Sequence, residues 1–238
     1  MTRLDRYLVD CNYFESRNRA LNAIKNSKIK VNGRLAKAST KIDSNSNIEI
    51  QEEKFYVSRA GKKLESFLLE HSINLKDKIA LDIGSSTGGF AQILLENGVK
   101  KIDCVDVGSN QLHYLLRKNS KIELFENCDI RDFRSDKEFD IISCDVSFIS
   151  ILQIINSINR LSNQKTDIIL LYKPQFEVGK DAKRDSRGVV VDMDLIDKTK
   201  KEFEHIIIKL GWVVKYQSIS KLAGKEGNLE YLYHFIKV

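Results

Sequence analysis

The sequence predicts an α/β protein in which a doubly wound parallel sheet follows a small α+β domain. From Lys78 onward, short apolar runs alternate with stretches of helical periodicity, and near-continuous apolar runs are typical of parallel strands covered on both faces. A glycine-rich stretch follows the first of these runs, and the basic charge is concentrated before residue 42. We therefore predict a small domain at residues 1–50, a linker at 51–57 and the sheet domain at 58–238.

The composition favours a soluble chain that stays in the cell. Its 238 residues are 42% hydrophobic, which is enough for a substantial core. No apolar run reaches the ~18 residues that a membrane helix needs, and the first ten residues carry charges where a signal peptide is apolar. The four cysteines and four histidines follow no metal-ligand spacing. We expect a cytoplasmic protein with no membrane segment and no metal.

Periodicity predicts two helices and a hairpin in the small domain. Apolar residues at helical spacing predict a first helix whose buried face carries Leu4, Leu8 and Cys11. Ser16 is placed to cap a second helix. The dipeptide Asn32-Gly33 predicts a two-residue hairpin turn, because both residues tolerate positive φ, and "NIEI" closes a further short strand.

The basic charge of the chain belongs to this small domain. Residues 1–41 carry ten Lys/Arg and three acids, a net charge of +7 in a chain whose total is +6. A compact basic module suggests a polyanion partner, most simply nucleic acid, although charge alone fits a solubilising surface equally well. The candidate phosphate contacts are Arg3, Arg6, Arg17, Arg19, Lys28, Lys30 and Arg34.

The small domain resembles the RNA-binding domain first known from ribosomal protein S4. The resemblance is carried by "RLDRYL", "SRNRAL" and "KVNGR" over about 50 residues. The family usually has a glycine just before the hairpin strand, where this chain reads Lys25-Asn26-Ser27. Asparagine supplies a similar turn. The resemblance implies that this domain binds RNA.

The remaining chain predicts the sheet domain element by element. We expect strands at residues 78–84, 100–108, 121–126, 139–147, 167–173, 212–219 and 231–238. We expect helices at residues 89–97, 111–118, 150–161 and 193–210. In such a sheet, ligands bind outside the C-terminal ends of the strands.

The stretch "LDIGSSTGGF", residues 81–90, ends the first strand and predicts a nucleoside site. Its G-x-x-x-G-G spacing matches neither a dinucleotide fingerprint nor a phosphate loop, and a tight strand–helix turn is the structural alternative. Asp82 suits an amine-bearing or cationic ligand, and Asp106, at the end of the second strand, suits ribose hydroxyls. These acids favour S-adenosylmethionine over NAD. The predicted cofactor-binding residues are Asp82, Gly84, Ser86, Gly88, Gly89, Phe90, Asp106 and Asp129.

A second site signal is Lys173, which ends the fifth strand and precedes the only proline of the chain. Asp145 ends the strand predicted to lie beside it. Pro174 biases Lys173 toward an extended conformation, and we expect it to stop any helix from starting there. The alternative is a lysine that marks where a strand reaches solvent.

A resemblance to one family covers nearly the whole chain. It is carried by "YVSRAGKKLE", "LDIGSSTGGF", "CDVSFIS", "KPQFEVGK" and "EGNLEYL". These stretches are similar to the TlyA family, the haemolysin A-like ribosomal RNA 2′-O-methyltransferases, whose catalytic domain resembles the FtsJ/RrmJ heat-shock methyltransferases. The loop "RDSRGVV" stands where the family more often has a glycine-rich stretch.

The resemblance implies a Rossmann-like methyltransferase sheet and S-adenosylmethionine as cofactor. It implies a tetrad at Lys63, Asp145, Lys173 and Glu230. Lys62 and Glu226 are rivals for the first and last positions. The implied substrate is ribosomal RNA within ribosomal subunits, methylated on cytidine of 23S and, in some members, also 16S rRNA. The chain is short at both ends, which favours the large-subunit form.

Three other functions are less consistent with the sequence. A pseudouridine synthase shares the RNA-binding domain but needs a largely antiparallel fold without the glycine loop. An exported cytolysin needs a secretion signal and apolar or amphipathic pore segments. A non-catalytic ribosome-binding protein has no use for the tetrad.

Overall fold

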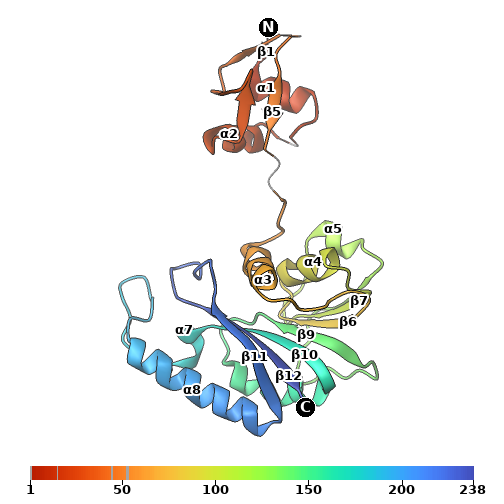
Figure 1. The fold of residues 1–238 in the computed structure, drawn as a ribbon, viewed down its shortest axis with the longest axis vertical. Helices are drawn as coiled ribbons and strands as arrows, with labels where there is room; N and C mark the ends of the chain where they lie inside the picture. The colour runs from red at the N-terminus through yellow and green to blue at the C-terminus, as the bar shows by residue number, and fades with distance from the viewer. Residues whose placement is uncertain (1, 15, 44, 52–53) are drawn as a thin grey trace. The chain divides into compact units, whose positions relative to one another are not determined.

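The computed structural model describes residues 2–14, 16–43, 45–51 and 54–238. The chain divides into two compact units, Met1–Phe55 and Tyr56–Val238 (Figure 1). Two residues of the predicted linker, Glu52 and Glu53, lie outside the described residues. Each unit has a core of its own, and each is described separately below.

The first unit packs two helices against short strands. The helices are α1 (Leu4–Asp10) and α2 (Arg17–Lys25), and the strands are β1 (Thr2–Arg3), β2 (Ile29–Val31), β3 (Arg34–Leu35), β4 (Lys41–Ile42) and β5 (Ile48–Ile50). Its core is formed by Leu4, Leu8, Ala20, Ile24, Ile29 and Ile42. The expectation for Cys11 was wrong: Cys11 is exposed at the C-terminal end of α1, because the helix ends before its third apolar position.

Local sequence signals explain how this unit is built. The hydroxyl of Ser16 accepts a hydrogen bond from the amide of Arg19 and so caps α2, as predicted. Asn32 and Gly33 have φ of 52° and 77°, and the hairpin they form pairs β2 with β3 in antiparallel register.

The second unit is built on a seven-stranded sheet in the order β11-β12-β10-β9-β6-β7-β8 (Figure 1). The strands are β6 (Ile79–Ile83), β7 (Lys101–Val105), β8 (Ile122–Phe125), β9 (Phe139–Cys144), β10 (Ser162–Tyr172), β11 (Trp212–Ile219) and β12 (Tyr231–Lys237). The five strands β6–β10 are parallel to one another, whereas β12 is antiparallel to both β10 and β11. The fully parallel expectation was therefore wrong for β12. No crossover helix separates β11 from β12, and parallel neighbours require one.

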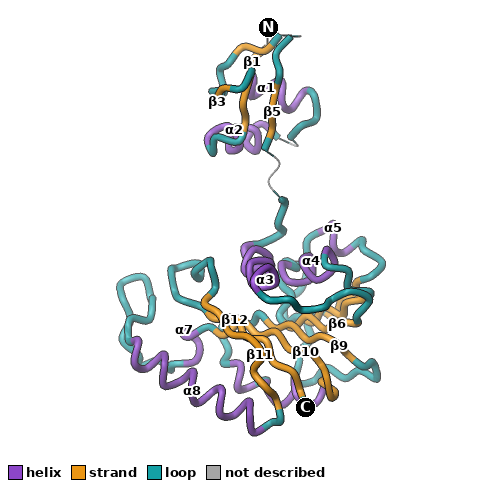
Figure 2. The backbone as a smooth tube through the Cα atoms, in the orientation of Figure 1, coloured by secondary structure: helices purple, strands orange, loops and turns teal. Residues whose placement is uncertain are grey.

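Helices cover both faces of this sheet (Figure 2). The helices α3 (Arg59–Glu70) and α4 (Gly89–Glu96) pack on one face, and α6 (Ile155–Leu161) and α8 (Met193–Lys209) pack on the other. Successive side chains of a strand point to opposite faces of the sheet. In β9, Ile141 packs in the core under α3 and α4, whereas Ile142 packs in the core under α6 and α8.

Several helices differ from the sequence prediction. The expected helix at 111–118 is the single turn α5 (Tyr114–Arg117), and the one at 150–161 is divided into the 3₁₀ turn Ile151–Gln153 and α6. The helix α3 had no predicted counterpart. The expectation that Pro174 prevents a helix was wrong, because α7 (Pro174–Glu177) begins at that proline. Proline is favoured at the first helical position, where its missing N–H costs nothing.

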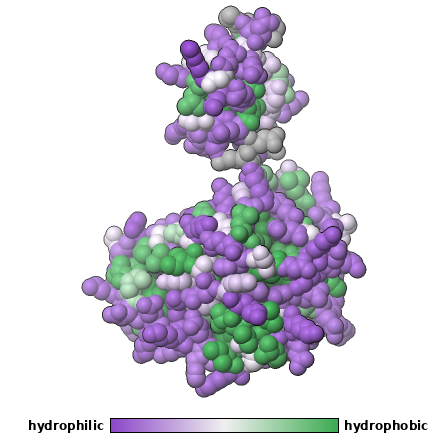
Figure 3. Space-filling model, viewed as in Figure 1, coloured by the Kyte–Doolittle hydropathy of each residue, from purple (hydrophilic) through white to green (hydrophobic). Residues whose placement is uncertain are grey.

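Among the described residues, no helix is both long and apolar enough to cross a membrane. Figure 3 shows one face of the molecule, on which hydrophilic side chains surround smaller hydrophobic patches.

Candidate functional site

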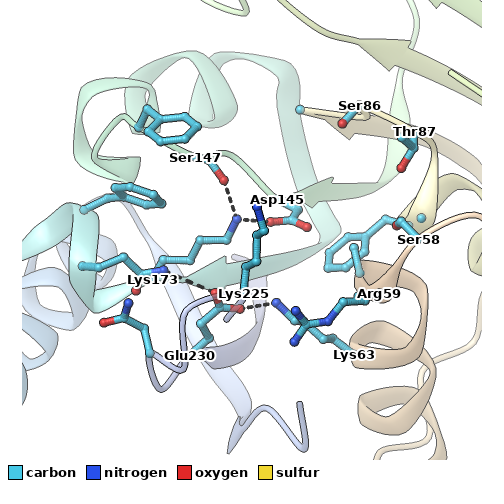
Figure 4. Close-up of a pocket in the computed structure, with 18 of the residues that line it drawn as sticks. Ser58, Arg59, Lys63, Ser86, Thr87, Asp145, Ser147, Lys173, Lys225 and Glu230 are labelled. Atoms are coloured by element: carbon cyan, nitrogen blue, oxygen red, sulfur yellow. Dashed lines mark hydrogen bonds and ion pairs between the residues drawn. The ribbon is translucent and has the colours of Figure 1, made fainter. Parts of the chain in front are cut away.

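The C-terminal ends of β6, β9 and β10 open into a cavity of about 730 Å³ (Figure 4). These ends carry Asp82 with the glycine loop, Asp145 and Lys173. The N-terminal half of α3 and the loop before β12 complete the wall. The parallel part of the sheet thus brings together residues that are far apart in the sequence.

Two ion pairs lie side by side in this cavity (Figure 4). The amine of Lys173 lies 2.6 Å from Oδ1 of Asp145, and the amine of Lys63 pairs with the carboxylate of Glu230. Lys63, Lys173 and Glu230 are each less than a tenth exposed. Each ion pair therefore includes at least one buried side chain, and removing one partner of such a pair is costly.

The structure separates the two pairs of rival residues. Lys63 points into the cavity from α3, whereas Lys62 is exposed and its amine lies 5.2 Å from the centre of the Tyr56 ring. Glu230 is buried in the ion pair, whereas Glu226 is exposed at the cavity wall. Lys62 does not line the cavity, whereas Glu226 lines it without taking part in the ion pair with Lys63.

Neutral side chains hold each ion pair, and sequence reasoning missed both. The amine of Lys173 donates to Oγ of Ser147 at 2.8 Å, and Nε2 of Gln175 donates to Glu230 at 3.3 Å. Their only sequence signal is their position: Ser147 lies two residues after Asp145, and Gln175 lies two residues after Lys173. Lys173 itself is extended, with φ −119° and ψ 98°, as expected before proline.

Asp82 is a buried carboxylate that forms no ion pair with any described residue. It is 1% exposed, and its Oδ1 accepts a hydrogen bond from Ser143 at 2.6 Å. Among the described residues Oδ2 makes no hydrogen bond, although the Ala91 amide is close enough to lower the pKa slightly. Burial dominates and raises the pKa of Asp82 to about 7. A cavity-lining carboxylate of this kind suits a cationic ligand group.

The glycine loop serves close packing as well as the cavity. Gly84 has φ +73°, and a Cβ there would lie 2.8 Å from the carbonyl oxygen of Asp145. A Cβ on Gly89 would lie 2.2 Å from Oγ of Ser58, so Gly89 allows α4 to approach α3. Gly84, Ser86, Gly89 and Phe90 line the larger cavity, whereas Gly88 lines neither cavity described here.

A second cavity of about 350 Å³ adjoins the first and shares Gly84, Ser86, Asp145 and Ser147 with it. Asp106 and Asp129, two of the predicted cofactor-binding residues, line this smaller cavity. The Asp106 carboxylate accepts from the amides of Ser86 at 2.8 Å and Gly108 at 2.7 Å. The Asp129 carboxylate binds Arg131, whose hydrogen bonds lower the pKa of Asp129.

In the first unit, the predicted basic residues fall into two groups. Arg3 and Arg17 both bind the fully buried Asp5, with nitrogen–oxygen distances of 3.0 and 2.6 Å. Their side chains are 41% and 52% exposed, so one carboxylate fixes two arginines at the surface. Arg6, Arg19 and Arg34 are exposed, Lys28 and Lys30 are half-buried, and the Arg19 guanidinium lies 5.7 Å from the centre of the Phe55 ring.

Comparisons with known proteins agree on both units. Residues 56–237 match the family described as FtsJ-like methyltransferase, and residues 2–48 match the S4 domain. The chain is 46% identical to the 23S rRNA (cytidine-2′-O)-methyltransferase TlyA of Campylobacter jejuni, over 93% of this chain and 94% of that protein. It is 31% identical to the 16S/23S rRNA (cytidine-2′-O)-methyltransferase TlyA of Mycobacterium tuberculosis, over 96% of this chain and 87% of that protein. A solved hemolysin structure from Streptococcus thermophilus has a TM-score of 0.73 and 31% identity, covering 100% of this chain and 88% of that one.

Proposed function

The chain belongs to the FtsJ-like methyltransferase family, and from that membership we infer that it is an S-adenosylmethionine-dependent ribosomal RNA 2′-O-methyltransferase. The observation that carries this function is the pair of buried lysine–carboxylate contacts beside the unpaired Asp82. The two relatives named above are cytidine-2′-O-methyltransferases. We propose cytidine of 23S rRNA, within ribosomal subunits, as the target, and therefore a cytoplasmic site of action.

The residues present fit S-adenosylmethionine. Asp82 offers a buried carboxylate oxygen that lacks a partner in the described chain, which suits the amine or sulfonium of this cofactor. Asp106 and the apolar side chains Val107 and Ile130 line the adjoining cavity, which suits a ribose and an adenine. When bound, the cofactor supplies a methyl group that is already activated for transfer.

We propose that Lys173 accepts the proton of the ribose 2′-hydroxyl. A hydroxyl is a weak nucleophile at neutral pH, so a positioned proton acceptor accelerates its reaction. Asp145 holds the Lys173 amine at the strand end. Lys63, fixed by Glu230 on the opposite wall, orients the hydroxyl. Holding the reacting atoms in line supplies much of the remaining acceleration.

The first unit supplies RNA affinity in this proposal. Its +7 charge in residues 1–41 suits a phosphate backbone, and such binding weakens steeply with salt. Deleting residues 1–50 should leave cofactor binding intact and weaken binding to ribosomal subunits, most visibly at higher salt. Unchanged subunit affinity in a folded truncated protein would refute this assignment.

The decisive experiment is mass-spectrometric mapping of 2′-O-methyl groups on rRNA from cells with and without the gene. The gene should add methyl groups that Lys173→Ala does not add, since loss of a proton acceptor costs ~10²–10⁴-fold in rate. Lys173→Arg should be nearly as damaging, because arginine does not deprotonate. Near-normal activity of Lys173→Arg would make Lys173 only a fixed charge.

Calorimetry tests cofactor binding independently of RNA methylation. The wild-type chain and Lys173→Ala should bind S-adenosylmethionine and S-adenosylhomocysteine equally well. Tight binding of NAD alone would overturn the cofactor assignment. Binding of the cofactor and of ribosomal subunits without any methyl transfer would indicate a non-catalytic ribosome-binding protein.

A further inference from the structure

Ser147 occupies a special place between the two cavities. It is the second residue after Asp145, it lines both cavities, and its Oγ lies 2.8 Å from the Lys173 amine. The cofactor cavity and the catalytic cavity meet where this contact is made. Sequence reasoning assigned no role to Ser147.

The backbone around Ser147 is held in an unusual conformation. The next residue, Phe148, is 92% exposed and has φ 66°, a conformation that is uncommon for a bulky side chain. The ring of Phe148 packs 5.3 Å from that of Phe176, in the helix that follows Lys173. The loop after β9 contacts the chain after β10 at several points, among them Ser147–Lys173, Phe148–Phe176 and Ser150–Glu177.

We propose that Ser147 is a positioning residue that directs the lone pair of Lys173 toward the ribose hydroxyl, an inference that rests on the proposed function. A neutral lysine amine has two N–H groups and one lone pair in a tetrahedral arrangement. Ser147 accepts one of these N–H groups, whereas Oδ1 of Asp145 lies 2.6 Å from Nζ in an ion-pair contact without hydrogen-bond geometry. The hydrogen bond to Ser147 therefore limits rotation of the amine about its Cε–Nζ bond, and with it the direction of the lone pair.

The hydroxyl suits both protonation states of Lys173. When the proton moves from the ribose oxygen to Nζ, a new N–H forms, and the oxygen electron pair bonds the methyl carbon as its bond to the cofactor sulfur breaks. The resulting ammonium has three N–H groups, and the one that binds Ser147 keeps its acceptor. With Asp145 alone, the amine rotates about its Cε–Nζ bond, and its lone pair points at the substrate for only part of the time.

The test is a single-turnover assay with the full-length protein, labelled S-adenosylmethionine and ribosomal subunits from cells that lack the gene. Ser147→Ala should lower the rate at saturating substrates by ~10–100-fold, since small misplacements of reacting groups have effects of that order. Affinity for S-adenosylhomocysteine, measured by calorimetry, should change by less than about threefold, because the carboxylates that recognise the cofactor are untouched. Ser147→Thr, which keeps the hydroxyl, should restore most of the rate.

Ser150→Ala is the matched control, because Ser150 lies in the same loop but binds Glu177 instead of Lys173. If Ser150→Ala lowers the rate as much as Ser147→Ala, the effect comes from the loop and the proposal is wrong. The deficit of Ser147→Ala should persist at high pH, because it arises from the direction of the lone pair. A deficit that disappears at high pH, or one confined to cofactor affinity, would overturn the proposal.

Wild type and Lys173→Ala in the same assay separate this inference from the proposed function. No methylation by wild type would refute the proposed function and this inference with it. Methylation that is lost in Lys173→Ala but normal in Ser147→Ala would refute only the role of Ser147.

Discussion

Two buried aspartates, one in each unit, have opposite electrostatic environments. Asp5 is 0% exposed and Asp82 is 1% exposed, so burial alone favours the protonated form of both. Hydrogen bonds from Arg3, and then from Arg17, outweigh burial and lower the pKa of Asp5 to about 2. Asp82 has only the Ser143 hydroxyl and a nearby amide, and its pKa rises to about 7.

The difference separates a carboxylate that is paired within the chain from one that suits a cationic ligand. Asp5 has its cations within the chain, and it fixes two half-exposed arginines in place. Asp82 lines a cavity and has an oxygen without a hydrogen-bond partner in the described chain. A buried carboxylate oxygen without a hydrogen-bond partner is costly, and a cationic ligand would relieve that cost. The tetrad lies between these extremes, because each of its carboxylates has one lysine.

The largest expected effect comes from removing the charge of Asp82. Asp82→Asn should weaken binding of S-adenosylmethionine by ~10–100-fold, the size of a lost charge-assisted hydrogen bond. Asp103→Asn is the matched control, because Asp103 lies on the neighbouring strand β7 and already pairs with Lys137 at 2.8 Å. Calorimetry should show no comparable loss for the control, and equal affinity of Asp82→Asn and wild type would contradict a role for Asp82.

Next in size is the effect of neutralising Asp5. Asp5→Asn removes charge-assisted hydrogen bonds to two arginines and should destabilise the first unit by ~1–3 kcal/mol. Hydrogen exchange of amides within residues 2–50 measures that change without interference from the second unit. The single-turnover rate at saturating ribosomal subunits should be unaffected. If protection of these amides is unchanged, Asp5 does not hold the arginines as described.

The sequence predicted the parts of the site that depend on strand ends. Asp82, Asp145 and Lys173 lie at the C-terminal ends of three parallel strands that are neighbours in the sheet. The proximity of these three side chains therefore follows from the fold class. The position of the glycine loop beside both cavities follows for the same reason. Lys63 and Glu230 were identified only through family resemblance, because their meeting depends on how α3 docks and on the antiparallel return of β12.

Other features depended on contacts that a linear sequence does not encode. Nothing near Asp5 in the sequence indicates that Arg17, twelve residues away, shares it with Arg3. Ser147 and Gln175 are ordinary polar residues until the loop and helix that carry them are placed. Pro174 was read as a barrier to helix formation, whereas its position at the start of α7 made it compatible with one.

The pH dependence of stability should differ in sign between the two aspartates. For Asp5, the folded-state pKa lies below the unfolded value, so its contribution is present above about pH 4 and is lost as pH falls toward about 2. For Asp82, the folded state keeps a proton that the unfolded state has lost. Stability of the second unit should therefore fall as pH rises from about 4 to about 7, by at most ~1.4 kcal/mol per pH unit.

Fluorescence of Trp212, the only tryptophan, reports unfolding of the second unit alone. Between pH 4 and 7, Asp82→Asn should reduce the pH dependence of the stability of the second unit. Cofactor affinity of the wild type should rise as pH passes through about 7, because binding favours the ionised carboxylate. A pH profile that is the same in wild type and Asp82→Asn would show that Asp82 does not titrate in this range.

The smallest expected effect concerns an arginine outside the Asp5 cluster. Arg6 is exposed, and within the described ranges it forms no ion pair. Arg6→Ala should weaken binding to ribosomal subunits only severalfold and reduce the salt dependence of log K by ~0.7–0.9, the contribution of one phosphate contact.

Arg17→Ala should show that change plus reduced hydrogen-exchange protection of the first unit, because it also removes a partner from buried Asp5. Lys198→Ala, an exposed lysine on α8 with a side chain 71% exposed, is the control for a loss of positive charge anywhere on the chain. If all three variants change the salt dependence equally, net charge alone governs RNA binding, and the arrangement around Asp5 contributes stability without contributing recognition.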